Sequence, residues 1–166
     1  MKLLVISDTH GCTSVIDGLI KAENPDVLFH LGDMQSDLKM SLLARRLPTY
    51  SVPGNCDNPY NIPGSEICVE LGGVRIFALH GHTRNMRLSP NRGIYAALEQ
   101  NANILLYGHT HTPLWDNLSG LTVINPGTAR FRGIESATYA VVNITPEGVN
   151  GQILPVKNEH IFEGEL

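Results

Sequence analysis

The chain has 166 residues, 42% hydrophobic and 17% charged, so a single domain over 1–166 with a buried core is expected. Apolar residues are too scattered for a membrane-spanning helix, and neither a signal peptide nor a membrane partner is expected. The net charge of −4 argues against a protein that coats nucleic acid. Three cysteines, none of them in a Cys-x-x-Cys pair, predict a reducing, cytoplasmic location.

The first part of the chain alternates between strand and helix patterns. Apolar runs typical of buried strands cover 2–7, 26–31 and 49–52. Apolar residues with helical spacing cover 15–20 and 38–47. Because each helix must cover a face of the sheet, this order predicts parallel strands joined by right-handed crossovers.

Hairpin signals dominate the rest of the chain. Strand patterns at 67–71 and 74–79 flank the turn pair Gly72-Gly73. A helix pattern over 94–98 and a strand pattern over 104–107 come next, and further hairpin-like units follow. The predicted fold class is therefore α/β, with two packed sheets, the second mostly antiparallel, and helices outside.

Side chains that can bind a metal follow five of the predicted strands. They are Asp8 and His10, then Asp33, then Asn55, Cys56 and Asp57, then His80 and His82, and finally His109 and His111. The carboxyl ends of neighbouring parallel strands lie along one edge of a sheet, so these five loops can converge. In the pairs Asp8-x-His10 and His109-x-His111, an extended backbone would point both ligands to the same side of the chain. Thr9 and Thr110, which lie between them, would then point to the opposite side.

The donor types indicate which metals would bind. Imidazole together with carboxylate suits Mn, Fe, Zn, Co or Ni, and so many imidazoles disfavour an all-oxygen Mg or Ca cage. One ion normally uses three or four protein ligands, so these candidates are too many for one ion and fit two. Two ions about 3.5–4 Å apart clamp the attacking and leaving oxygens of an in-line displacement. The sequence therefore predicts a two-metal site suited to phosphoryl chemistry.

In order and spacing, these motifs resemble those of the calcineurin-like metallophosphoesterases, most closely the small YfcE-like phosphodiesterases. They span residues 8–111, and Asn125-Pro126-Gly127-Thr128 looks like the loop that follows in that family. The resemblance implies a four-layer α/β/β/α sandwich of two mixed β-sheets flanked by helices. It also implies a ligand set: Asp8, His10 and His111 for a first metal, Asn55, His80 and His109 for a second, and Asp33 as the bridge.

The activity implied by this resemblance is that of a dinuclear metal-dependent phosphodiesterase, in which a metal-bridging hydroxide attacks phosphorus directly. Two divalent ions are the expected cofactor, with Mn first and Ni, Zn, Fe, Co and Mg as alternatives. The expected substrate is a small phosphoester, and a homodimer or homotetramer is the expected assembly. Asn55, His80, His82 and Cys56 are the candidate catalytic residues, with His82 either behind the ligands or facing the substrate.

Cys56 departs from the pattern of the wider superfamily. Many members place a histidine after the motif asparagine, where it can protonate the leaving oxygen. A thiol is a weak donor with an ordinary pKa of about 8.5, so Cys56 is not expected to be a strong general acid. Departure of the leaving group is then expected to depend on a metal, on water or on a low leaving-group pKa.

Two alternative functions and three side-chain roles stay open. A protein-binding scaffold like the retromer subunit of the same fold has no need for a complete ligand set, and a nuclease would be expected to carry a basic stripe. His30, inside a strand, is expected to be a hydrogen-bonded core residue, and Asp57 an acceptor that stabilises its loop. Arg84, Arg87, Arg92, Arg130 and Arg132 either contact phosphate or lie in solvent, and the second is the favoured role.

Overall fold

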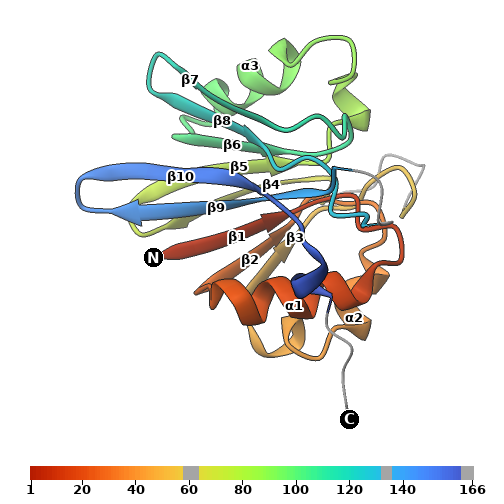
Figure 1. Ribbon diagram of the computed structural model, residues 1–166. Coiled ribbons are helices and arrows are strands. Elements are labelled where there is room, and N and C mark those ends of the chain that lie inside the picture. Colours follow the sequence, from red (N-terminus) through yellow and green to blue (C-terminus); the bar gives the residue numbers. More distant parts are fainter. Residues whose placement is uncertain (58–63, 132–135, 162–166) are drawn as a thin grey trace.

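The computed structural model describes residues 1–57, 64–131 and 136–161. Within these residues ten strands form two five-stranded sheets, which pack face to face with helices on both outer sides (Figure 1). The strand order is β10-β9-β1-β2-β3 in one sheet and β4-β5-β6-β8-β7 in the other. The predicted four-layer α/β/β/α sandwich of two mixed sheets is confirmed.

The first sheet contains the three strands predicted at the start of the chain. Its strands are β1 (Lys2–Ile6), β2 (Val27–His30), β3 (Thr49–Ser51), β9 (Thr138–Thr145) and β10 (Gly148–Pro155). Strands β1, β2 and β3 are parallel, whereas β9 runs antiparallel to both β1 and β10. Helices α1 (Thr13–Glu23) and α2 (Ser36–Met40) cover the outer face of this sheet (Figure 1).

The second sheet is parallel at its centre and antiparallel at its edges. Its strands are β4 (Glu66–Leu71), β5 (Val74–Leu79), β6 (Ile104–Tyr107), β7 (Leu114–Leu118) and β8 (Leu121–Asn125). Helix α3 (Asn91–Glu99) covers its outer face (Figure 1). The prediction of a mostly antiparallel second sheet was wrong, because the last hairpin, β9–β10, pairs with β1 of the first sheet and leaves β5, β6 and β8 side by side in parallel.

Three apolar clusters hold the four layers together. Leu3 and Val5 of β1 lie in the cluster between the two sheets, whereas Leu4 and Ile6 lie in the cluster beneath α1. Strands β5 and β6 divide their side chains in the same way between the inner cluster and the cluster beneath α3. Because both faces of these strands are covered, their sequences are continuously apolar rather than alternating.

The second predicted helix is split. Helix α2 is short, and a separate 3₁₀ turn spans Ala44–Arg46, so the prediction of one helix over 38–47 was wrong. The buried carboxylate of Asp17 on α1 accepts the hydroxyl of Ser41 and the backbone N–H of Leu43, the latter at 3.0 Å. These bonds replace the backbone acceptors that a continuous helix would have supplied.

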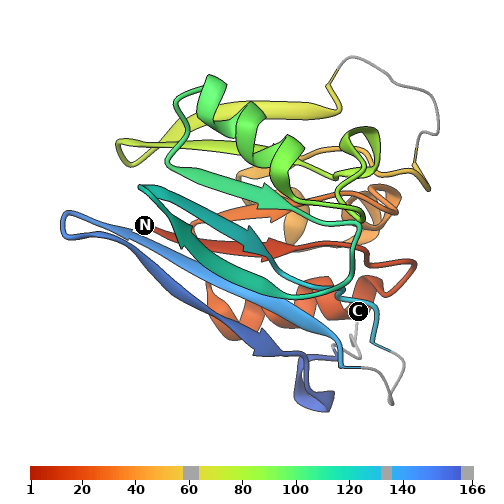
Figure 2. The ribbon, with the colours of Figure 1, turned by 90° about the horizontal axis from the view of Figure 1, so that it is seen from above.

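One edge of the sandwich collects the loops that follow the parallel strands. Strands β1 and β6, from different sheets, point to the same side in both ribbon views (Figures 1 and 2).

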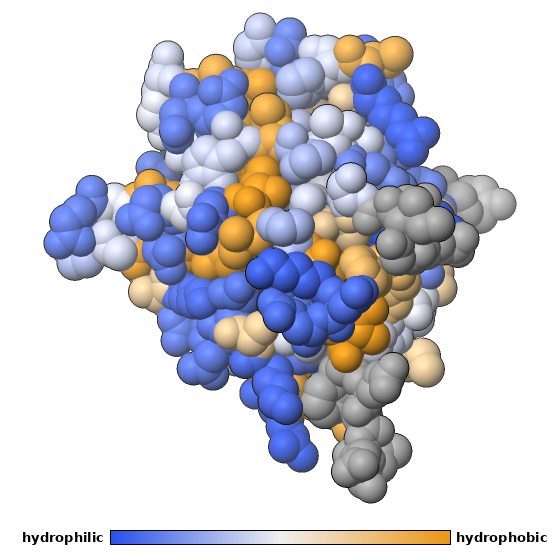
Figure 3. Space-filling view, in the orientation of Figure 1, coloured by the Kyte–Doolittle hydropathy of each residue, from blue (hydrophilic) through white to orange (hydrophobic). Residues whose placement is uncertain are grey.

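The surface of the face in Figure 3 is mostly hydrophilic, with a narrow apolar band across its middle. None of the helices in the described part of the chain has the length and apolar character needed to cross a membrane.

Candidate metal centre

Four of the predicted ligands lie close together at this edge. Asp8, His10, Asp33 and His111 each offer one ligand atom, and these atoms all lie within 4.8 Å of one another. Asp8 Oδ1 is 3.1 Å from His111 Nε2, and Asp33 Oδ2 is 3.8 Å from His10 Nε2. With metal–ligand bonds of about 2.0–2.2 Å, neighbouring ligand atoms on one ion are about 3 Å apart. The spacing of Asp8 and His111 therefore fits two ligands of a single ion.

The remaining predicted ligands lie on the other side of Asp33. His80 Nε2 is 3.5 Å from Asp33 Oδ1 and 3.2 Å from Asn55 Oδ1, and the rings of His80 and His109 are 5.0 Å apart. His80 Nδ1 is 2.6 Å from the carbonyl oxygen of Leu31, to which only a protonated Nδ1 can donate. This bond fixes the tautomer in which Nε2 is free to bind a metal.

The carboxylate of Asp33 faces both groups of histidines. Its Oδ2 lies toward His10, whereas its Oδ1 lies toward His80 and accepts the backbone N–H of Cys56 at 2.8 Å. The residue is almost fully buried, at 3% exposure. Asp33 therefore offers one carboxylate oxygen to each of the two groups of side chains.

Several buried polar atoms at this edge lack a protein partner. Among the described residues, Asp8 Oδ1, His82 Nδ1 and His109 Nδ1 make no hydrogen bond. An unpaired buried polar atom costs about 1–3 kcal/mol, so such atoms are rare outside functional sites. A carboxylate oxygen and ring nitrogens that lack a protein partner can bind divalent cations, and transition metals accept such a mixed nitrogen and oxygen donor set.

The ligand loops have a backbone that the sequence analysis did not predict. Asp8, His10, His109 and His111 have φ angles of 55°, 45°, 66° and 58°, which is the left-handed region. The expectation of extended pairs was therefore wrong, because the strands end at Ile6 and Tyr107, before the ligands begin. Non-glycine residues adopt this conformation at an energetic cost, and such positions cluster at functional sites.

The side chains between the paired ligands do point away from them. Thr9 Oγ1 donates to the buried Asp37, at 2.7 Å, and Thr110 Oγ1 accepts the side-chain amide of Asn125, at 2.9 Å. Thus the predicted direction of Thr9 and Thr110 is confirmed, although tight turns rather than extended strands produce it.

Two residues that the sequence analysis gave no role hold these loops in place. The buried Asn125 also donates from its side chain to the carbonyl of Gly108 at 3.1 Å, and Thr128 Oγ1 donates to the carbonyl of Asp8 at 2.9 Å. The sequence predicts only a loop at the motif that contains them. The available signal was its position, since it directly follows β8 as the ligand loops follow their own strands.

The charges of the site are adjusted by mutual contact. Burial would raise the pKa of Asp8, but the nearby His111 and His80 and the Ser7 hydroxyl hold it below its ordinary value. The contact with Asp8 raises the pKa of His111, whereas burial and the charges of His80 and Arg87 lower the pKa of His109 to about 4. His109 is therefore neutral at pH 7, which is the form of imidazole that binds a metal.

Cys56 and His82 lie beside the ligands. Burial and then the carboxylates of Asp33 and Asp57 raise the pKa of the Cys56 thiol to about 11, so the thiol stays protonated in this environment. The ring of His82 lies 5.4 Å from that of His80 and 6.2 Å from that of His109, and burial lowers its pKa. His82 thus lies against the second ligand group as a neutral side chain.

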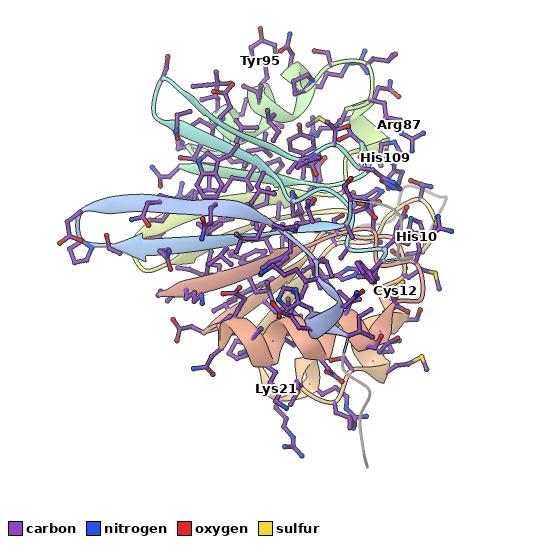
Figure 4. All side chains as sticks on the ribbon, viewed as in Figure 1. His10, Cys12, Lys21, Arg87, Tyr95 and His109 are labelled. Carbon is purple, nitrogen blue, oxygen red and sulfur yellow. The ribbon has the colours of Figure 1, made fainter. Side chains whose placement is uncertain are left out.

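The neighbouring charged residues have distinct partners. Asp57 accepts the backbone N–H groups of Gln35 and Gly54, at 2.6 and 2.9 Å, which confirms its predicted role as a loop acceptor. Arg84 forms a bidentate pair with Glu66, whereas the exposed Arg87 donates only to the carbonyl of His109, at 3.4 Å, among the described residues. In Figure 4 Arg87, His109 and His10 lie along the same edge of the molecule.

His30 is the buried, hydrogen-bonded core residue that the sequence predicts. It is fully buried; its Nδ1 accepts the N–H of Gly32, and its Nε2 is 3.1 Å from Thr9 Oγ1. Burial lowers the pKa of His30 from 6.5 to about 4. A histidine in an unfolded chain is protonated below about pH 6.5, so protonation favours unfolding in the window between these two values.

A loss of stability on acidification is the expected result. The contribution of the neutral His30 to the free energy of unfolding is complete above pH 6.5. It decreases by about 3 kcal/mol in all as the pH falls to 4. The free energy of unfolding in urea, measured from pH 7 to pH 4.5, should decrease less steeply for His30→Gln than for the unsubstituted protein. Parallel curves for the two proteins would contradict a neutral His30 in the folded state.

Comparison with known proteins agrees with this geometry. Residues 1–147 match the calcineurin-like phosphoesterase superfamily domain, and the chain belongs to this family. It is 28% identical over 147 residues to the probable metallophosphoesterase YsnB of Bacillus subtilis, covering 87% of this chain and 85% of the relative. It is also 28% identical over 170 residues to the phosphodiesterase YfcE of Escherichia coli, covering 86% and 88% of the two chains. These relatives support a metal-dependent phosphoesterase.

Solved structures share the fold. A predicted phosphoesterase from Streptococcus pneumoniae superposes with a TM-score of 0.75 at 26% identity, over 98% of this chain and 93% of that one. A Vps29 variant from Entamoeba histolytica superposes with a TM-score of 0.70 at 17% identity, over 95% and 100%. At that identity the second comparison establishes the fold alone.

Proposed function

We propose that this chain is a dinuclear metal-dependent phosphodiesterase that hydrolyses a small phosphoester in the cytoplasm, acting as one domain over residues 1–166. The observation that carries the proposal is the position of Asp33, whose two carboxylate oxygens face His10 on one side and His80 on the other. The resemblance of the motifs to those of the family implies the same bridging role for Asp33.

The proposed ligand sets follow the two groups of side chains. Asp8, His10 and His111 would hold the first cation, Asn55, His80 and His109 the second, and Asp33 both. When bound, such a pair supplies an activated water and polarises the phosphoryl group. Manganese is the proposed ion, with Ni, Zn, Fe, Co and Mg as alternatives, because imidazole and carboxylate donors predominate.

The chain's own residues then have limited chemical tasks. Burial and the carboxylates of Asp33 and Asp57 raise the pKa of the Cys56 thiol to about 11, which disfavours a thiolate nucleophile at this position. Direct hydrolysis without a covalent intermediate is therefore proposed. His82, neutral and partly exposed beside His80 and His109, is proposed to face the substrate and to hydrogen-bond a phosphate oxygen or the leaving group.

Metal removal is the direct test of this function. Protein treated with excess chelator should lose hydrolysis of bis-(p-nitrophenyl) phosphate, and adding manganese should restore it with about two ions bound per chain. Elemental analysis together with the rate measures both quantities. Full activity in excess chelator, or restoration with no bound metal, would contradict the proposal.

Cys56→His provides a second prediction, on leaving groups. An imidazole at this position can protonate a departing oxygen, which a neutral thiol of pKa about 11 does poorly. We expect the variant to accelerate esters with alkyl leaving groups by about 10²-fold or more, and those with nitrophenyl leaving groups much less. The check is the slope of log kcat against leaving-group pKa, with Cys68→His on the exposed face of β4 as the control. An unchanged slope would disprove the acid argument.

Two alternatives are less well supported. A protein-binding scaffold is favoured only by the shared fold of Vps29 at 17% identity, and it would not require a complete set of seven ligands. A nuclease is disfavoured by the net charge of −4. Comparing single-stranded DNA with small diesters as substrates distinguishes the nuclease, and any homodimer or homotetramer would appear in the mass of the protein in solution.

A further inference from the structure

A buried carboxylate behind the metal centre has no ion-pair partner among the described residues. Asp37, on α2, is only 2% exposed. Burial of a carboxylate without a counter-charge is costly unless strong hydrogen bonds compensate. None of the proposed catalytic or ligand roles uses this residue, so its bonds indicate what it does.

Asp37 accepts hydrogen bonds from the residues on either side of one proposed ligand. Its Oδ2 accepts the hydroxyl of Thr9 at 2.7 Å and the backbone N–H of Gly11 at 2.9 Å. Thr9 and Gly11 are the residues immediately before and after His10. One carboxylate oxygen therefore fixes both neighbours of His10, whose own φ of 45° is unfavourable for a side-chain-bearing residue.

The same contacts extend to β2. The N–H of Gly32 donates to His30 Nδ1, so the proton of this ring is on Nε2, which lies 3.1 Å from Thr9 Oγ1. Donation then runs in one direction, from His30 to Thr9 and from Thr9 to Asp37. Since each acceptor is filled, the Asp8–His10 loop is held against β2 and α2 in one arrangement.

Asp17 provides a matched comparison within the chain. It is also a buried carboxylate, at 7% exposure, and it also accepts a hydroxyl and a backbone N–H. Its partners, Ser41 and Leu43, lie in the turn after α2 and flank no proposed ligand. Loss of Asp17 should therefore affect stability without affecting the metal centre.

We propose that Asp37 is a positioning residue that orients His10 toward the first metal ion by bonding the residues on either side of it. The inference rests on the proposed function, because it assigns His10 as a ligand. The proposed role of Asp37 depends on an acceptor oxygen in the right position. An asparagine side chain can supply such an oxygen as well.

The test is a titration of metal-free protein with manganese, in which calorimetry measures the binding of the ions. Asp37→Leu, similar in size but without an acceptor, should weaken the binding of one ion by about 10–100-fold, the usual effect of removing a partner that orients a ligand. Asp37→Asn should bind both ions as the unsubstituted protein does. Asp17→Leu should lower the melting temperature yet leave both affinities unchanged.

A double substitution locates the effect. If Asp37 acts through His10, then in a His10→Ala background Asp37→Leu should cause no further loss of metal affinity. A full additional loss would overturn the proposal, and so would unchanged binding by folded Asp37→Leu or weakened binding by Asp37→Asn. The Gly11 amide of the metal-free protein supplies an independent NMR measurement, because its proton should move upfield when the Asp37 acceptor is removed.

Two further outcomes keep the inferences separate. If the unsubstituted protein binds no divalent ion, the proposed function itself fails, whatever Asp37 does. If Asp37→Leu does not fold, Thr9→Val removes one of the same bonds with little change in shape, and it should weaken the same ion. Unchanged binding by Thr9→Val would then overturn the proposal.

Discussion

Asp33→Asn is expected to lower kcat for diester hydrolysis by roughly a thousandfold, the largest effect of any single substitution at the centre. A cation that stabilises transition-state charge contributes several kcal/mol, and each 1.36 kcal/mol is a factor of ten in rate. Both oxygens of Asp33 face imidazoles, and an amide offers only one oxygen and no charge. One of the two proposed ions should therefore be lost together with the activity.

The control for Asp33→Asn is Asp17→Asn, at a buried carboxylate of α1 whose partners lie in the turn after α2 and flank no proposed ligand. It should retain both ions and most of the activity. Metal content and kcat, measured on the same samples, separate the two variants. Two bound ions and normal turnover in Asp33→Asn would remove Asp33 from the bridging position.

The convergence of the proposed ligands was predictable from the sequence because it follows from topology. Asp8, Asp33, His80 and His109 each come just after an apolar strand, and parallel strands place such positions at one edge. The pairing of β1 with β2 and of β5 with β6 brings the loops together within each sheet, and the packing of the two sheets brings the two sets of loops together. This step requires no knowledge of side-chain geometry.

The parts that were not predictable depend on contacts between segments that are far apart in sequence. The left-handed backbone at His10 is fixed by Asp37, and the break after α2 is fixed by Asp17 of α1. Likewise, the last hairpin could join either sheet, and its alternating pattern does not predict that it pairs with β1. Local periodicity predicts whether a segment is a helix or a strand. It does not predict hydrogen bonds to acceptors that lie far away in the sequence.

The close packing of the Asp33 loop leads to a second large expected effect, at Gly54. A Cβ at this position would lie 2.1 Å from Asp33 Oδ1 and 2.4 Å from the backbone nitrogen of Asp33. The backbone nitrogen cannot move aside as a flexible side chain could. Gly54 is not among the glycines with positive φ, so the effect of an added methyl group would be steric rather than conformational.

Gly54→Ala should therefore displace Asp33 and reduce diester hydrolysis about as much as Asp33→Asn does. Overpacking at a buried site costs about 1–3 kcal/mol of stability, so the melting temperature should fall as well. Gly120→Ala is the matched control: its φ of +94° makes alanine unfavourable, but no atom lies within 4 Å of the new Cβ. We expect that variant to lose stability and to keep full activity. If Gly54→Ala were as active as Gly120→Ala, the loops would be able to separate without loss of function, and the spacing between Gly54 and Asp33 would not define the metal centre.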